Sequence, residues 1–114
     1  MKHFMKLNRI PFEMIASGKK TIELRLYDEK RQLIKSGDEI EVTCTEDKGE
    51  KLLVRVKALH RFADFKELYK ELSLESCGYE IWELDKAKPS DMDKYYSKQQ
   101  QEKYGVVGIE IELV

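Results

Sequence analysis

The most informative segment of the sequence is Gly18-Lys19-Lys20-Thr21-Ile22-Glu23-Leu24-Arg25. From residue 21 to residue 27, apolar side chains alternate with polar or amphipathic ones, and this period of two predicts a β-strand. The apolar positions, which we expect to point into the core, are Ile22, Leu24 and Leu26. Glu23, Arg25 and Tyr27 then share the opposite face, which we expect to line a cleft. A slip of one residue in this register would bury the charges.

The charged residues of this strand form a candidate binding site. Glu23 and Arg25 are two positions apart, so their Cα atoms lie roughly 7 Å apart on one face of the strand. A carboxylate beside a guanidinium stays ionised and orients its donors, and Lys20 adds a mobile charge at the start of the strand. This pattern is typical of a cradle for an anion or a nucleotide. On spacing alone, however, the pattern is more typical of an ordinary half-solvated antiparallel strand.

The stretch resembles the G-x-K-x-x-E-x-R signature of the ASCH (activating-signal-cointegrator homology) domain family. The four defining positions are occupied by Gly18, Lys20, Glu23 and Arg25. The Ser-Gly-Asp turn at 36–38 and the Lys-Tyr-Gly-Val run at 103–106 also resemble small stand-alone ASCH proteins, so the resemblance covers essentially the whole chain. It implies a single α+β domain over residues 1–114. The expected fold is a small PUA-like curved β-sheet or barrel of about five to six strands with flanking helices.

The resemblance also implies an RNA- or nucleotide-binding protein whose ligand cleft is lined by the signature. The expected ligand-binding residues are Lys19, Lys20, Glu23, Arg25 and Tyr27. Some small ASCH proteins look like amidohydrolases that deacetylate N4-acetylcytidine, with a lysine at the position of Lys20 and a threonine at that of Glu23. Others have been ascribed ribonuclease activity. Whether this chain is an enzyme stays open; if it is, Lys20 and Glu23 are the expected catalytic residues.

The two functional classes place different demands on Lys20. A binding module needs a charged Lys20 beside Arg25 in an open basic groove, with an affinity that falls as salt rises. A hydrolase needs an enclosed pocket and a desolvated Lys20 that gives up its proton to a nearby carboxylate. Because Glu23 is adjacent and keeps Lys20 charged, the sequence favours binding. The distant glutamate of the similar hydrolases has no assigned counterpart among Glu67, Glu71 and Glu75.

Composition bounds the possible partners. At 114 residues the chain is long enough for one modest core. Its 21 basic and 22 acidic residues nearly cancel, so nucleic-acid binding requires a local basic patch. No apolar segment is long enough to span a membrane or target the chain to one, so we expect a cytoplasmic protein. Cys44 and Cys77 lack a C-x-x-C spacing and have only His3 and His60 to help, so we expect reduced thiols, no metal and no cofactor.

The rest of the chain predicts alternating strands and helices. Strands are expected at 3–7, 39–44, 52–59 and 106–114, with the first of them central in the sheet. Helices are expected from Pro11 to a Gly18 cap, over 64–72, and from Ser90 toward Tyr104. Residues 28–32 read as a charged loop, and 73–89 show no period. We expect Trp82 to pin this irregular segment to the domain, with stacking on a nucleobase as the alternative.

Overall fold

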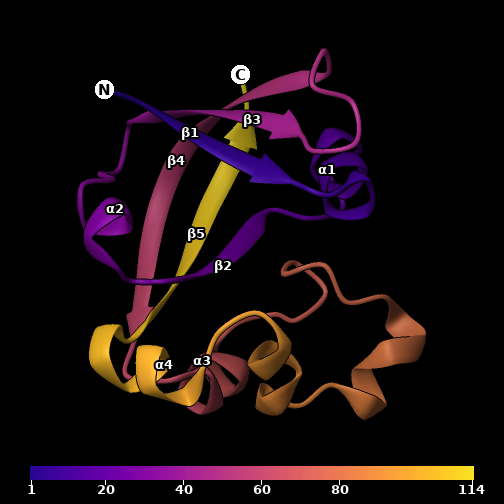
Figure 1. Ribbon diagram of the computed structural model, residues 1–114. Coiled ribbons are helices and arrows are strands. Elements are labelled where there is room, and N and C mark those ends of the chain that lie inside the picture. The colour runs from indigo at the N-terminus through magenta and orange to yellow at the C-terminus, as the bar shows by residue number, and fades with distance from the viewer.

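The computed structural model describes residues 1–114, which form a five-stranded mixed sheet with flanking helices. The strands are β1 (Lys2–Leu7), β2 (Ile22–Leu26), β3 (Glu39–Cys44), β4 (Lys51–Phe62) and β5 (Val106–Leu113). Their order is β1-β3-β4-β5-β2; β1 runs parallel to β3, and every other pair is antiparallel. The sheet curls into a half-barrel (Figure 1). The α+β architecture predicted from the sequence is therefore confirmed.

The helices gather mainly at one end of the half-barrel. They are α1 (Arg9–Ala16), α2 (Glu29–Gln32), α3 (Phe65–Glu71), α4 (Lys98–Tyr104) and the 3-10 helices η1 (Ile81–Lys86) and η2 (Pro89–Lys94). Figure 1 shows α3, α4 and the segment between them below the sheet, whereas α1 lies beside β3. None of the helices combines the length and the apolar character that crossing a bilayer requires.

Two apolar clusters stabilise the fold, one on each face of β2. The larger cluster fills the half-barrel, where inward-facing residues of β3, β4 and β5 meet Phe12 and Ile15 of α1. The second cluster joins the apolar face of β2 to Phe65 and Leu68 of α3. The predicted burial of Ile22, Leu24 and Leu26 is thus correct, although these side chains face the helices and not the barrel interior.

Several boundaries differ from the sequence prediction for local reasons. The strand β1 lies at an edge of the sheet and not at its centre, since it pairs only with β3. Residues 28–32 contain a one-turn helix because the Asp28 side chain accepts a hydrogen bond from the Arg31 amide at 3.1 Å. The single helix expected from Ser90 to Tyr104 is two helices, since Ser97 caps α4 by accepting from the Gln100 amide.

The two edge strands of the half-barrel meet through a side chain. Arg25 of β2 donates a hydrogen bond from its guanidinium to the backbone carbonyl of Lys6 in β1, with an N–O distance of 3.2 Å. No backbone ladder joins β1 to β2. One arginine of the signature therefore bridges the gap at which the sheet fails to close, and it occupies part of the polar edge that β1 leaves open.

Candidate functional site

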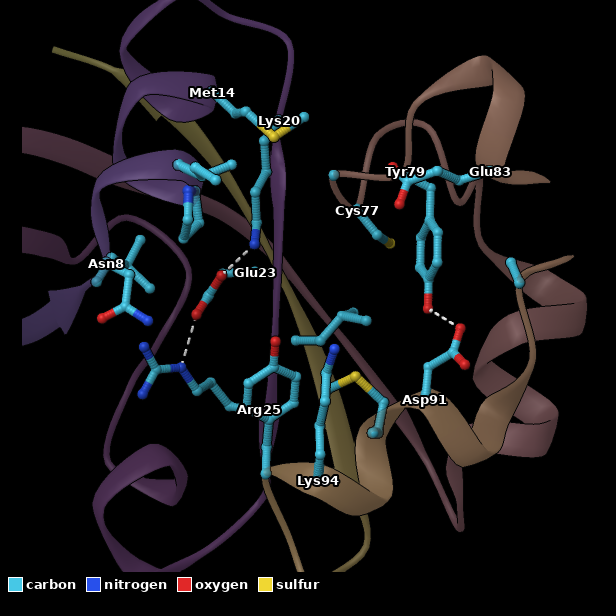
Figure 2. Close-up of a pocket in the computed structure, with 18 of the residues that line it drawn as sticks. Asn8, Met14, Lys20, Glu23, Arg25, Cys77, Tyr79, Glu83, Asp91 and Lys94 are labelled. Carbon is cyan, nitrogen blue, oxygen red and sulfur yellow. Dashed lines mark hydrogen bonds and ion pairs between the residues drawn. The ribbon is translucent and has the colours of Figure 1, made fainter.

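The charged residues of the signature form one connected group, which we call the motif cluster: Lys20, Glu23 and Arg25. One carboxylate oxygen of Glu23 pairs with Lys20 Nζ at 2.7 Å, and the other accepts from Arg25 Nε at 2.7 Å (Figure 2). Glu23 is only 6% exposed and is the one charged residue in the buried core. Glu23 is therefore buried even in the register predicted from the sequence, because both faces of this strand are covered.

Electrostatics keeps Glu23 and Arg25 ionised. Burial by itself would raise the pKa of Glu23, but the positive charges of Lys20 and Arg25 outweigh it and hold this pKa below its ordinary value. Burial likewise acts to lower the pKa of Arg25, and the Glu23 carboxylate outweighs it and raises that pKa. Two cations around one carboxylate leave the cluster with a net positive charge.

Backbone contacts fix the position of Lys20 just before the start of β2. The helix α1 ends in a turn at Gly18, whose φ of 84° suits a glycine, and the Lys20 amide then donates to the Met14 carbonyl at 3.0 Å. Opposite, Gly78 has a φ of 107°, and a Cβ at this position would lie 3.3 Å from Lys20 Cδ. The absence of a side chain at Gly78 therefore makes room for the lysine stem.

The motif cluster lines a cleft of about 780 Å³ between the half-barrel and the segment that follows α3. One wall carries the cluster with Asn8 at the end of β1. The opposite wall carries Tyr79 and Asp91, and Figure 2 shows them facing the cluster across the cavity. A cleft of this size lies within the range of small-molecule sites, roughly 300–1,000 Å³.

The lining of the cleft is more basic than the chain as a whole. Five cationic side chains line it against three acidic ones, while the chain carries a net charge of −1. Two of the five belong to the motif cluster. The other three, Lys6, Lys86 and Lys94, form no ion pair with a carboxylate. The local basic patch that nucleotide binding requires is present in the cleft.

Two of the residues expected at the site lie elsewhere. Lys19 is exposed and pairs with Glu80 at 3.4 Å, and it does not line the cleft. The Tyr27 ring packs against the barrel core, with the Arg61 guanidinium 4.2 Å from its centroid, and it does not line the cleft either. Their contacts with a ligand stay predictions.

Sequence reasoning missed the wall that faces the motif cluster. Here the Tyr79 hydroxyl donates to Asp91 at 2.9 Å and lies 2.6 Å from the Tyr69 hydroxyl of α3. Burial and both hydrogen bonds raise the pKa of Tyr79, so its phenol stays protonated. The expectation that Trp82 packs the segment is wrong, since it is 75% exposed at the rim of the cleft. The sequence of this wall has no hydrophobic period from which its structure could be predicted. Its only signal was a mixture of aromatic residues and lysines.

Other chemistry in the cleft is limited. Cys77 lies in the lining, but burial raises its pKa to about 11, so at neutral pH it is a thiol and a poor nucleophile. No group of three or more His, Cys, Asp or Glu side chains is arranged as a set of metal ligands. Hydrogen-bond donors on the motif cluster are therefore the main chemical feature of the cleft.

Comparison with known proteins places this geometry in a family. The family model described as ASCH domain matches residues 5–114, and no curated protein matches the chain. The crystal structure of hypothetical protein PH0355 is similar over 100% of both chains, with 39% identity and a TM-score of 0.82. The solution structure of protein PF0455 from Pyrococcus furiosus is 38% identical with a TM-score of 0.73, covering 100% of this chain and 98% of that one.

A more distant structure supports the fold alone. A tyrosine-to-phenylalanine mutant of ZmASCH from Zymomonas mobilis is 14% identical, with a TM-score of 0.68, covering 97% of this chain and 68% of that one. The half-barrel sheet with flanking helices agrees with the PUA-like fold expected from the signature. The family match extends over nearly the whole chain and includes the motif cluster and both walls of the cleft. This chain belongs to the ASCH domain family.

Proposed function

We propose that the cleft binds a nucleotide, either free or as a unit of an RNA strand, and that Lys20 and Arg25 hold it. One observation carries this proposal: buried Glu23 fixes both cations at the wall of a cleft whose lining is net positive. Membership in the ASCH domain family agrees with a ligand of the nucleic-acid type. The chain as a whole is not basic, so recognition is local to the cleft.

The motif cluster offers donors and not acceptors. Each oxygen of Glu23 already faces one cation, and Arg25 also donates to the Lys6 carbonyl. Of the five N–H bonds of a guanidinium and the three of an ammonium, three on Arg25 and two on Lys20 remain for a ligand. Phosphate oxygens and base carbonyls are the matching acceptors in a nucleotide. Charge-assisted hydrogen bonds of this kind contribute about 1.5–3 kcal/mol each.

Hydrolysis of an acylated nucleoside such as N4-acetylcytidine is a second candidate, because Lys20 meets two of its requirements. Its side chain is only 11% exposed, and Glu23 lies within proton-transfer distance at 2.7 Å. Nucleophilic attack needs the neutral amine, however, and the lowered pKa of Glu23 opposes transfer of the lysine proton to that carboxylate. Binding by a charged Lys20 is therefore the better supported function.

The binding test compares two arginines in one titration. Nucleoside 5′-monophosphates and short single-stranded RNA are titrated by calorimetry into wild type, Arg25→Ala and Arg55→Ala. Arg25→Ala is expected to weaken binding at least about tenfold, because it removes charge-assisted donors. Arg55, on the outside of β4 and paired with Glu39 at 3.6 Å, is the matched control and is expected to change affinity less than about twofold. Equal small effects would leave both arginines as ordinary surface charges.

Lys20 separates the two candidate functions. Lys20→Arg keeps the charge but does not deprotonate near neutral pH, so it is expected to retain weakened binding, whereas Lys20→Ala loses more. The same proteins are incubated with a panel of nucleosides that includes N4-acetylcytidine, and the products are read by mass spectrometry. Turnover by wild type, lost equally in both variants with ligand affinity unchanged, would establish the hydrolase in place of the binding module.

A further inference from the structure

The helix η1 exposes apolar surface beside the cleft without a partner. It buries none of its residues, and Trp82, the only tryptophan of the chain, is 75% exposed although it lines the cleft. Leaving so large a ring in water forgoes the stabilisation that its burial would give the fold. The Trp82 ring is therefore accessible to a ligand at the cleft.

Unpaired cations accompany exposed aromatic rings on this wall. Lys86 follows Trp82 in η1, and Lys94 of η2 lies with its Nζ 5.2 Å from the ring centroid of Tyr95, which is 62% exposed. Figure 2 shows Lys94 extending from η2 into the cavity opposite the motif cluster. Neither lysine forms an ion pair, so both charges are available to a phosphate. Aromatic faces beside cations are the combination that single-stranded nucleic acids bind.

We infer that Trp82, Lys86, Lys94 and Tyr95 form an outer subsite that binds a second nucleotide, through stacking of its base and pairing of its phosphate. The inference rests on the proposed function, in which the motif cluster holds the first nucleotide. None of the four residues belongs to the signature, and none contacts the motif cluster through an ion pair or a hydrogen bond. With one nucleotide at the motif cluster and a second at the outer subsite, the inferred ligand is a phosphorylated strand of at least two nucleotides and not an isolated nucleoside.

The dimensions of the cleft suit this ligand. Its volume of about 780 Å³ lies toward the upper end of the roughly 300–1,000 Å³ range of small-molecule sites. Its rim is open, since Trp82, Tyr95 and Ile10 all line it while remaining largely exposed. A strand can therefore continue past the motif cluster, where a closed pocket would stop it.

The wall that carries the outer subsite is held in place without a ligand. Tyr79 links this wall to α3 through the hydrogen bond to Tyr69 and to η2 through the hydrogen bond to Asp91. The Asp91 carboxylate also accepts from the Lys88 amide at 3.2 Å. Tyr96, next to Tyr95, stacks on Phe65 of α3 with a centroid distance of 6.3 Å. Because the supporting residues are distinct from the exposed ones, substitution of Trp82 or Lys86 is expected to leave the fold intact.

The single tryptophan provides a direct measurement. Uridine 5′-monophosphate and the 5′-phosphorylated dinucleotide pUpU are titrated into wild type, with affinity measured by calorimetry and Trp82 emission recorded in parallel. The same pair of cytidine ligands is titrated alongside. We expect the dinucleotides to bind roughly tenfold more tightly than the mononucleotides, because base stacking on an aromatic ring adds to the affinity. Only the dinucleotides are expected to quench Trp82 strongly.

Three variants and two controls locate the effect. Trp82→Ala is expected to remove the dinucleotide advantage while changing mononucleotide affinity less than twofold, and Trp82→Phe is expected to restore part of it. Lys86→Ala is expected to flatten the salt dependence, since each neutralised phosphate of a single strand contributes about 0.7 to the slope of log K against log salt. Leu33→Ala and Lys48→Ala are matched controls, because both residues are exposed and neither lines the cleft.

The outcomes distinguish this inference from the proposed function. Mononucleotide binding without a dinucleotide advantage, or with Trp82 quenched equally by both ligands, would overturn the outer subsite and leave binding at the motif cluster standing. Absence of binding by every ligand would overturn both. A dinucleotide advantage that survives in Trp82→Ala would assign the second base to other residues and would also overturn the inference.

Discussion

Glu23 is the residue that holds the motif cluster together, because its carboxylate pairs with both cations of the signature. A buried charge is costly unless it is paired, and the pair is costly to break because the remaining charges stay buried. The lowered pKa of Glu23 shows that Lys20 and Arg25 more than offset its burial. The same residue thus orients the donors of Lys20 and Arg25 and links the candidate site to the stability of the fold.

Glu23→Gln tests this link through stability. The substitution keeps the shape of the side chain but leaves Lys20 and Arg25 without their anion, so the free energy of unfolding is expected to fall by about 3–5 kcal/mol. Urea denaturation followed by circular dichroism measures the change. Glu39→Gln removes a carboxylate that pairs with Arg55 on the exposed face of the sheet, and about 0–1 kcal/mol is expected. Similar losses in the two variants would contradict the buried-pair account.

At the scale of residues, the sequence predicted which side chains come together but not their surroundings. Spacing and the signature identified Lys20, Glu23 and Arg25, because a strand of period two places such residues on one face. The burial of Glu23 was not predictable, since it depends on a half-barrel interior that distant strands build. The prediction for Trp82 failed because apolar character normally favours burial, whereas this ring remains exposed.

At the scale of elements, β2 is covered on both faces although its sequence alternates. The face that carries Glu23 and Arg25 turns toward the half-barrel, and the apolar face meets α3 across β5. Close approach is possible because Gly108 of β5 lies opposite Leu24 of β2 and adds no side chain. The contact between strand and helix therefore depends on one glycine in the middle of a strand.

Gly108→Ala is expected to separate these elements. A Cβ at this position would lie 2.7 Å from Leu72 Cδ1 and 3.0 Å from Ile22 Cγ2. The Leu72 methyl can move, but Ile22 is β-branched and stiff, so we expect a loss of about 1–3 kcal/mol in the free energy of unfolding. Gly49→Ala, in the exposed turn before β4, is the control and is expected to stay within about 0.5 kcal/mol. A neutral Gly108→Ala would show that the helix layer shifts without cost.

Helices and strands were predictable where the hydrophobic period was strong. The prediction failed where a capping residue sets the boundary of a helix. The strands and α3 follow hydrophobic periodicity, and their positions agree with the sequence within a few residues. The break between η2 and α4 depends on the Ser97 cap, which competes with the earlier signal at Ser90. The edge position of β1 depends on long-range pairing, on which a strand pattern is silent.

At the scale of the whole molecule, charge is unevenly distributed. The net charge of −1 conceals a cleft with more basic than acidic residues, while carboxylates elsewhere form ion pairs that support the sheet. One of these carboxylates, Asp38, joins β1 to the turn before β3. Its side chain lies 2.8 Å from His3 Nε2 and accepts from the Lys35 amide at 3.0 Å.

Asp38 is expected to make the molecule sensitive to acid. The contacts with His3 and the Lys35 amide lower the pKa of Asp38 to about 2, compared with about 3.9 in an unfolded chain. Because the folded pKa is the lower one, the stabilisation is present above pH 4 and is lost as the pH falls toward 2. The difference in unfolding free energy between wild type and Asp38→Asn should therefore shrink over this interval in urea titrations. Asp47→Asn, in the exposed hairpin, is the control, and a constant difference would contradict the linkage.

The pairing of β2 has a consequence for how the chain is made. This strand pairs only with β5, so residues 22–26 have no strand partner until residues 106–110 have been synthesised. At roughly 5–20 residues per second, the nascent chain spends several seconds with that partner missing. During this interval three alternating aliphatic side chains and an unpaired backbone are open to misassociation. The segment that carries the motif cluster is thus also one of the last to gain its place in the sheet during synthesis.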